Sequence, residues 1–92
     1  MKKYYVYFMS NRNNTVLYVG VTGNLERRVL DHRCLVKGFT ARYRCTKLVY
    51  FEEYGLIEEA INRETQIKKW SRRAKDRLVD SMNPERVDLM PW

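Results

Sequence analysis

Two short runs of aromatic, β-branched and other apolar residues lie near the start of the chain, and they limit its possible folds more than any other feature. The first run covers Tyr4 to Met9 and the second covers Val16 to Val21. Residues of these types favour strands, and the asparagine-rich segment 11–14 between the runs is typical of a turn. The sequence therefore predicts a β-hairpin that turns at Arg12 and Asn13.

A helix and a third strand follow the hairpin. Asn24 is a candidate N-cap, because its side-chain oxygen can accept a hydrogen bond from the first turn of a helix. The expected helix begins near Leu25 and ends before Gly38. Its helically spaced positions are Leu25, Val29, His32 and Val36. After a polar, basic loop through Arg44, residues 47–54 again have the character of a strand.

Two further helices complete the predicted fold. Gly55 separates the third strand from a helix that runs towards Trp70, with an apolar stripe formed by Ile57, Ala60, Ile61 and Ile67. A last helix is expected over Arg73 to Met82, where Asn83 and Pro84 stop it. The sequence thus predicts an α+β domain, with a small, three-stranded, mainly antiparallel sheet flanked by about three helices.

The length and charge of the chain narrow its function. A chain of 92 residues has room for one compact domain, expected over residues 1–84, and for a tail, residues 85–92, that packs on the domain or extends from it. The net charge of +7 favours binding to a polyanion. No segment is typical of a signal peptide, a transmembrane span or a membrane-surface helix, so we expect a cytoplasmic protein without a membrane partner.

The two cysteines do not favour a zinc site. Cys34 and Cys45 lack the closely spaced Cys or His partners that bind zinc. We interpret them as reduced, partly buried thiols, as is usual in a cytosolic protein.

One carboxylate falls on an otherwise apolar helical stripe. Glu64 lies four residues after Ala60 and three before Ile67, which places it beside the edge of the core. A half-buried carboxylate needs a partner. That partner is either an arginine in a structural salt bridge or a divalent cation at the rim of a site.

Four other side chains and one glycine have ordinary explanations when taken singly. Arg28 and His32 lie one turn apart on the first helix and are expected to point together towards the sheet or its border. Tyr7 and Tyr18 are expected nearly opposite each other on the hairpin. Gly20 interrupts the second strand, which indicates a bulge or a close approach by another group. The alternatives are a packed histidine, a surface arginine and a cross-strand aromatic pair.

The order of these residues resembles a known motif. Tyr5-Val6-Tyr7, ten further residues and then Tyr18-Val19-Gly20 resemble the paired motif of GIY-YIG nucleases, although Tyr5 and Val6 replace the first glycine and isoleucine of the family name. Residues 21–28 resemble the family segment that ends in a functional arginine, which is Arg28 here rather than Arg27.

The resemblance continues along nearly the whole chain and is greatest to the short, stand-alone bacterial members of the family. His32 matches a histidine found four residues after the functional arginine in many members, and Glu64 matches the metal-binding glutamate. Asn83 is a candidate for a polar residue near the end of the family's domain.

The resemblance implies a metal-dependent endonuclease that hydrolyses phosphodiester bonds in DNA, directed by structure or single strands rather than by a long sequence, as in DNA repair. The implied catalytic residues are Tyr7, Tyr18, Arg28, His32 and Glu64. Glu64 would hold one Mg²⁺ or Mn²⁺ and Arg28 the scissile phosphate, while Tyr7 is the preferred activator of water. Tyr18 and His32 would position groups or transfer protons, in roles that can be exchanged.

The basic residues supply the predicted contacts to nucleic acid, with DNA favoured over RNA. These residues are Arg27, Lys68, Lys69, Arg72 and Arg73, and the alternative is a solvated helical face. Two other functions stay open. One is a nucleic-acid-binding module without useful catalysis, and the other is an adaptor that binds a protein partner through Tyr50, Phe51 and the C-terminal apolar residues.

Overall fold

The computed structural model describes residues 2–34 and 44–90 of the chain. Three strands form one antiparallel sheet in the order β2-β1-β3. The strands are β1 (Tyr4–Ser10), β2 (Leu17–Thr22) and β3 (Lys47–Tyr54), and the helices are α1 (Leu25–Cys34), α3 (Ile57–Lys68) and α4 (Arg72–Met82). The predicted α+β fold is therefore confirmed. The predictions for Val36 and Gly38, and for the last two residues, lie outside the described residues.

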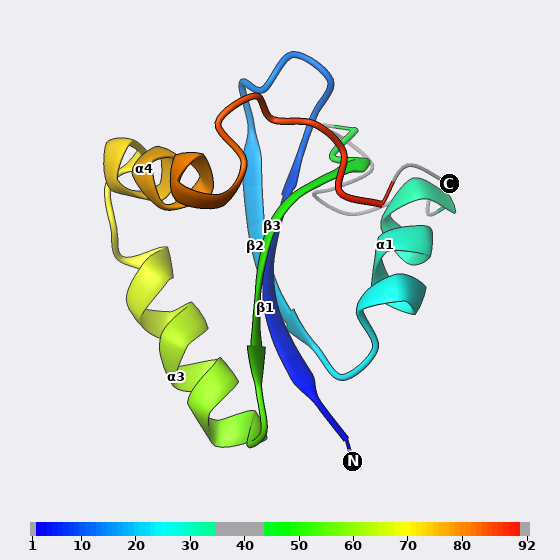
Figure 1. The fold of residues 1–92 in the computed structure, drawn as a ribbon, viewed down its shortest axis with the longest axis vertical. Coiled ribbons are helices and arrows are strands. Elements are labelled where there is room, and N and C mark those ends of the chain that lie inside the picture. Colours follow the sequence, from blue (N-terminus) through cyan, green and yellow to red (C-terminus); the bar gives the residue numbers. More distant parts are fainter. Residues whose placement is uncertain (1, 35–43, 91–92) are drawn as a thin grey trace.

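The sheet lies between two helical layers, with α3 and α4 on one face and α1 on the other (Figure 1). Alternate residues of a strand point to opposite faces, so the central strand β1 contributes to both layers. Val6 and Phe8 pack with apolar residues of α3 and α4, whereas Tyr7 and Met9 belong to the cluster that includes Val29 of α1. The sheet therefore carries one core on each face.

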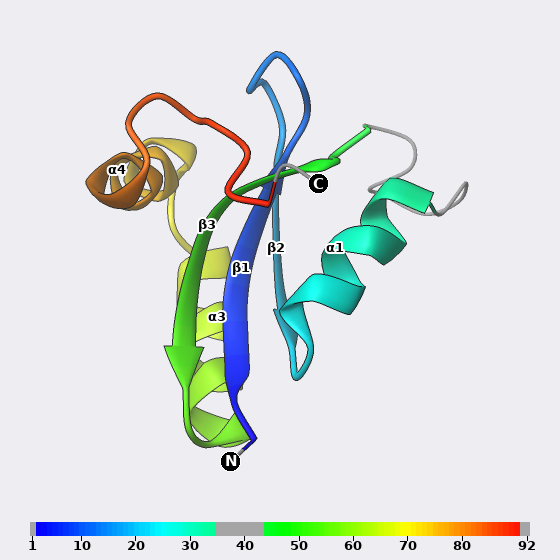
Figure 2. The same ribbon diagram turned by 45° about the vertical axis from the view of Figure 1, so that its right-hand side comes forward.

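The C-terminal segment returns from α4 across the sheet to the side of α1 (Figures 1 and 2). The amide of Leu89 donates to the carbonyl of Leu48 at 2.8 Å. Arg33 of α1 pairs with Asp88 at 2.7 Å and also donates to the carbonyl oxygen of Met90, whose side chain is buried. Residues 85–90 thus pack against the sheet and α1.

The register of the hairpin differs from the prediction. Tyr7 pairs with Gly20, and Tyr18 pairs with Met9, so the two tyrosines are diagonal neighbours on one face and the prediction that they lie nearly opposite is wrong. The turn is longer than expected, because the Asn11 side chain accepts hydrogen bonds from the amides of residues 15 and 16. Asn14 then adopts the left-handed conformation, with φ of 59°.

The surface expected to bind a protein partner is largely buried. Tyr50 is 6% exposed and packs edge-on against Phe8, with 5.4 Å between the ring centroids. Met90 is also 6% exposed, and Phe51 is half-buried. The prediction was wrong for Tyr50 and Met90, because strand alternation directs Tyr50 into the core beneath α3 and α4 and the C-terminal segment folds back over the sheet.

Two further expectations concerned the state of the cysteines and the absence of a membrane-spanning helix. Cys34 is exposed and Cys45 is buried, and both thiols are free. In the described part of the chain, no helix has the length and apolar character needed to cross a membrane.

Candidate active site

Three aromatic rings meet on the α1 face of the sheet. The phenol oxygen of Tyr7 lies 2.9 Å from Nε2 of His32, in a buried hydrogen bond between β1 and α1. The Tyr18 ring lies 5.0 Å from the His32 ring and 6.3 Å from the Tyr7 ring, measured between centroids. Three of the predicted site residues, Tyr7 of β1, Tyr18 of β2 and His32 of α1, therefore form one cluster.

Gly20 makes this arrangement possible. It pairs directly with Tyr7, and a Cβ atom at this position would lie 2.6 Å from the phenol oxygen and 2.7 Å from Cζ of Tyr7. Any larger residue would overlap these atoms, so the glycine in the strand serves a close approach rather than a bulge. Because β2 is an edge strand, the phenol end of Tyr7 lies near the edge of the sheet.

Burial favours the neutral forms of Tyr7 and His32. Burial, aided by the charge of Arg28, lowers the pKa of His32 to about 4. Burial also raises the pKa of Tyr7 above its ordinary value, and Tyr18 adds to that rise. A neutral imidazole has one nitrogen that donates and one that accepts. Nδ1 of His32 is buried and has no hydrogen-bond partner among the described residues, whereas Nε2 contacts Tyr7.

Arg28 lies on α1, one turn before His32. Its side chain is exposed, whereas His32 is buried against the sheet. The positive charge of Arg28 nevertheless lowers the pKa values of both Tyr7 and His32. The adjacent Arg27 instead pairs with Asp31 at 3.3 Å. This difference favours Arg28 as the residue that faces a substrate at the cluster.

Glu64 reaches the same region from α3. Its side chain is 20% exposed, which agrees with its predicted place at the edge of the core. Its charge raises the pKa of Tyr7, and Lys68, whose ammonium group is 3.2 Å from the Glu64 carboxylate, lines a groove together with Tyr18 of β2. Helix α3 packs against β1 and β2 from the opposite face. We infer that Glu64 approaches Tyr7 at the β2 edge of the sheet.

The salt-bridge partner of Glu64 is a lysine rather than an arginine. Nζ of Lys68 lies 3.2 Å from Oε2 of Glu64, and the Lys68 side chain is 55% exposed. An exposed pair one helical turn apart contributes only about 0.3–0.5 kcal/mol. Arg63 is paired with Glu52 instead, at 2.9 Å. The carboxylate of Glu64 is therefore not committed to a strong structural bridge.

The chemistry around Glu64 fits a hard divalent cation. The described residues contain no group of three or more His, Cys, Asp or Glu side chains that could hold a metal. A protein-enclosed metal site is thus not formed by these residues. Mg²⁺ keeps several waters and often binds through one or two carboxylates plus substrate phosphates. Glu64 is a single, partly exposed carboxylate and suits that mode of binding, in which a cation would replace the ammonium group of Lys68 as its partner.

The predicted nucleic-acid contacts differ in how freely they can act. Arg27, Lys68, Lys69 and Arg73 are exposed. Arg72 is exposed too, but its guanidinium donates to the carbonyls of Asn14 and Thr15 and pairs with Asp76. Arg72 therefore ties α4 to the hairpin turn.

Asn83 has a structural environment away from the cluster. Its side chain is almost fully buried and donates from Nδ2 to the carbonyls of Val49 and Val87, at 3.1 and 2.7 Å. Its Oδ1 accepts a hydrogen bond from the amide of Val87 at 3.1 Å. These bonds secure the end of α4 to β3.

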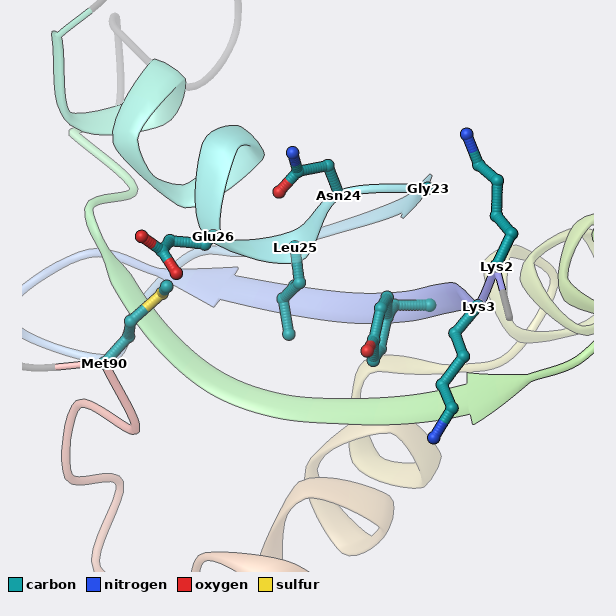
Figure 3. Close-up of a pocket in the computed structure, with 8 residues that line it drawn as sticks. Lys2, Lys3, Gly23, Asn24, Leu25, Glu26 and Met90 are labelled. Atoms are coloured by element: carbon teal, nitrogen blue, oxygen red, sulfur yellow. The ribbon is translucent and has the colours of Figure 1, made fainter.

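A pocket whose lining does not include Tyr7 or His32 lies at the N-terminal end of α1 (Figure 3). It has a volume of about 670 Å³ and is lined by Lys2, Lys3, Tyr5, Gly23, Asn24, Leu25, Glu26 and Met90. The ammonium groups of Lys2 and Lys3 point away from each other, and Lys3 pairs with Glu53 at 3.1 Å. None of the five predicted catalytic residues lines this pocket. Its size alone therefore does not make it the site of the chemistry.

The fold and the cluster define a class of protein. The chain belongs to the GIY-YIG family, since the model of the GIY-YIG catalytic domain matches residues 3–77. The matched range includes Tyr7, Tyr18, Arg28, His32 and Glu64. The predicted family is therefore confirmed, and it is a nuclease family whose domains bind nucleic acid.

The relatives are small proteins of similar length. The chain is 39% identical to a UPF0213 protein of Syntrophus aciditrophicus over 89 residues, which cover 95% of this chain and 100% of that protein. It is 37% identical to a UPF0213 protein of Staphylococcus haemolyticus over 87% of this chain and 98% of the relative. The solution NMR structure of a UPF0213 protein from Bacillus halodurans superimposes with a TM-score of 0.59, at 26% identity, over 90% of this chain and 88% of that one.

Proposed function

We propose that this protein is a metal-dependent endonuclease that hydrolyses phosphodiester bonds in DNA. The observation that carries the proposal is the buried hydrogen bond between the Tyr7 phenol and Nε2 of His32, with the Tyr18 ring beside both, inside the range that matches a GIY-YIG catalytic domain. Phosphodiester hydrolysis needs an activated water, a cation for the phosphate and stabilisation of the leaving oxygen. One phenol with an imidazole, a guanidinium and a carboxylate close to it supports this combination.

Tyr7 and His32 would activate the attacking water together. Tyr7 donates its hydroxyl proton to Nε2 of His32 while its oxygen accepts a proton from water. The water oxygen would bond to phosphorus as the bond from phosphorus to the 3′ oxygen breaks, and the 3′ oxygen would leave with the electron pair and take up a proton from solvent water. Because Tyr7 is neutral in its buried site, the proton would move through the phenol without formation of a free phenolate, and His32, whose pKa is about 4, would carry it only transiently.

The other residues would hold the phosphate. The exposed guanidinium of Arg28 can clamp the scissile phosphate, and it also lowers the pKa of Tyr7, which favours loss of its proton. Tyr18 would position the water or the phosphate beside His32. Glu64 would hold one Mg²⁺ or Mn²⁺, which supplies positive charge to the phosphate and the leaving oxygen when bound.

The preference for a structure or a single strand follows from the kind of contact available. Arg27 on α1, Lys69 between α3 and α4, and Arg73 on α4 are exposed cations, and cations of this kind bind phosphates. Phosphate contacts fix the position of a nucleic acid and do not read its bases. We therefore expect cleavage that depends on the shape of the DNA rather than on a long sequence.

The direct test is a cleavage assay with matched variants. Purified protein is incubated with duplex, single-stranded and branched DNA, and with RNA, in Mg²⁺ or Mn²⁺. We expect wild-type protein to cut a DNA substrate, chelation to stop cleavage, and Glu64→Ala and Arg28→Ala each to lower the rate by about 100-fold or more. Glu59→Ala, an exposed carboxylate on the same helix, should keep the wild-type rate.

Two results would overturn the proposal. Equal activity of wild type, Glu64→Ala and Arg28→Ala would remove the site from the chemistry. Salt-sensitive binding by wild-type protein without cleavage of any substrate would instead assign the chain as a nucleic-acid-binding module.

A further inference from the structure

A groove runs beside β2, next to the candidate active site. It has a volume of about 320 Å³ and is lined by Leu17, Tyr18 and Val19 of β2, Lys68 of α3 and Lys75 of α4. The groove therefore lies where the edge strand β2 meets α3 and α4, the two helices on the face of the sheet opposite α1.

The groove and the cluster described above share Tyr18. Tyr18 lines the groove, and its ring lies 5.0 Å from the ring of His32. Lys68 lines it too, and its ammonium group is 3.2 Å from the carboxylate of Glu64. A chain that leaves the cluster beside Tyr18 would thus enter the groove directly.

The charge of the groove is positive. Both of its ionisable cations are lysines, and no Asp or Glu is among its lining residues. The side chain of Lys75 is half-buried and forms no salt bridge within the described residues, whereas its neighbour Arg72 is paired with Asp76. Leu17 and Val19 give the lysine stems apolar surface to lie against. An ammonium group held in this way is ready to neutralise an anion.

We propose that this groove binds a backbone phosphate of the substrate strand next to the scissile phosphate, with Lys75 as its main ligand and Lys68 as its second. The inference rests on the proposed function, because it assumes that the polyanion is the DNA that is cut. Each phosphate that a protein neutralises releases condensed counterions. Lys75 should therefore contribute to the salt dependence of DNA binding.

The experiment measures binding without cleavage. Fluorescence anisotropy gives the affinity of a labelled single-stranded and a labelled duplex oligonucleotide, in chelator, over a series of salt concentrations. Lys75→Gln keeps much of the stem but removes the charge. Arg77→Gln is the matched control, because Arg77 is exposed on the same helix and does not line the groove. Lys75→Arg tests whether a positive charge restores binding.

The slope of log affinity against log salt is negative. In Lys75→Gln we expect its magnitude to decrease by about 0.7 for single strands and by about 0.9 for duplex. The slope should be unchanged in Arg77→Gln and in Lys75→Arg. If Lys75→Gln and Arg77→Gln have the same slope as a wild-type protein that binds and cuts DNA, the groove assignment is wrong and the proposed function stands. If wild-type protein neither binds nor cuts any DNA, both are wrong.

Discussion

At the scale of single residues, the contact between Gly20 and Tyr7 decides whether the cluster can form. A methyl group on Gly20 would lie 2.6 Å from the phenol oxygen. We expect Gly20→Ala to destabilise the protein by about 1–3 kcal/mol, as overpacking does, and to reduce cleavage by displacing the phenol. Chemical denaturation measures the first effect.

Making Gly20→Ala in a second variant, Tyr7→Ala, separates the overlap with Tyr7 from a general effect of alanine in the strand. In the Tyr7→Ala background the overlap is absent, so Gly20→Ala should have little further cost. The same loss of stability in both backgrounds would show that Tyr7 is not the group that requires glycine.

The protonation of His32 is a second residue-scale prediction. Its pKa of about 4 in the folded protein lies below the ordinary value of 6.5. Between these values the unfolded chain binds more protons than the folded one, so stability rises with pH across this window. The contribution is full above about pH 6.5, is lost as the pH falls towards 4, and amounts to roughly 3 kcal/mol at most.

His32 is the only histidine of the chain, so proton NMR reports on it without ambiguity. The ring proton shifts should titrate with a midpoint near 4 in the wild-type protein. A midpoint at or above 6.5 would contradict the buried, neutral imidazole. Tyr18→Ala should move the midpoint upwards, because it opens the ring to solvent.

At the scale of elements, a polar network joins β3 to α3. Glu52 accepts hydrogen bonds from the hydroxyl of Tyr54 at 2.6 Å, from that of Tyr50 and, through both oxygens, from Arg63. Burial raises the pKa of Glu52, but these bonds outweigh it and hold the pKa below its ordinary value. Arg63 immediately precedes Glu64, so the network sets the position of the proposed metal ligand.

We expect Glu52→Gln to lower the free energy of unfolding by about 2–3 kcal/mol, because it leaves a half-buried Arg63 without its charged partner. Glu53→Gln is the control on the same strand. Its ion pair with Lys3 is about half exposed on both sides and contributes well under 1 kcal/mol. Urea denaturation of both variants checks the difference, and equal effects would contradict a special role for Glu52.

The elements themselves could be predicted, because strand and helix signals are local. Tyr4 to Met9 and Ile57 to Ile67 carry clear patterns of their own. The register could not be predicted, because it depends on hydrogen bonds that the Asn11 side chain makes inside the turn. The error moved the partner of Tyr7 by two residues, from Tyr18 to Gly20. A shift of two keeps every side chain on its face, so Tyr7 and Tyr18 still share one face of the sheet, as predicted.

At the scale of the whole molecule, the proposed site draws on both faces of the sheet. Tyr7, Tyr18 and His32 meet under α1, whereas Glu64 comes from the helix on the opposite face. The resemblance to a family placed these residues in one site, and no local pattern could do so. The groove at Lys75 was not predicted, because it depends on how α4 packs beside β2.

The most direct test of a shared site is a double-variant cycle on DNA cleavage under single-turnover conditions. Tyr7→Phe and Glu64→Gln should each slow cleavage by roughly 100- to 10,000-fold. Residues that act as one unit are strongly non-additive. The account predicts that the double variant is about as slow as the slower single variant. A double variant slowed by the product of the two single effects, or a single variant with the wild-type rate, would contradict it.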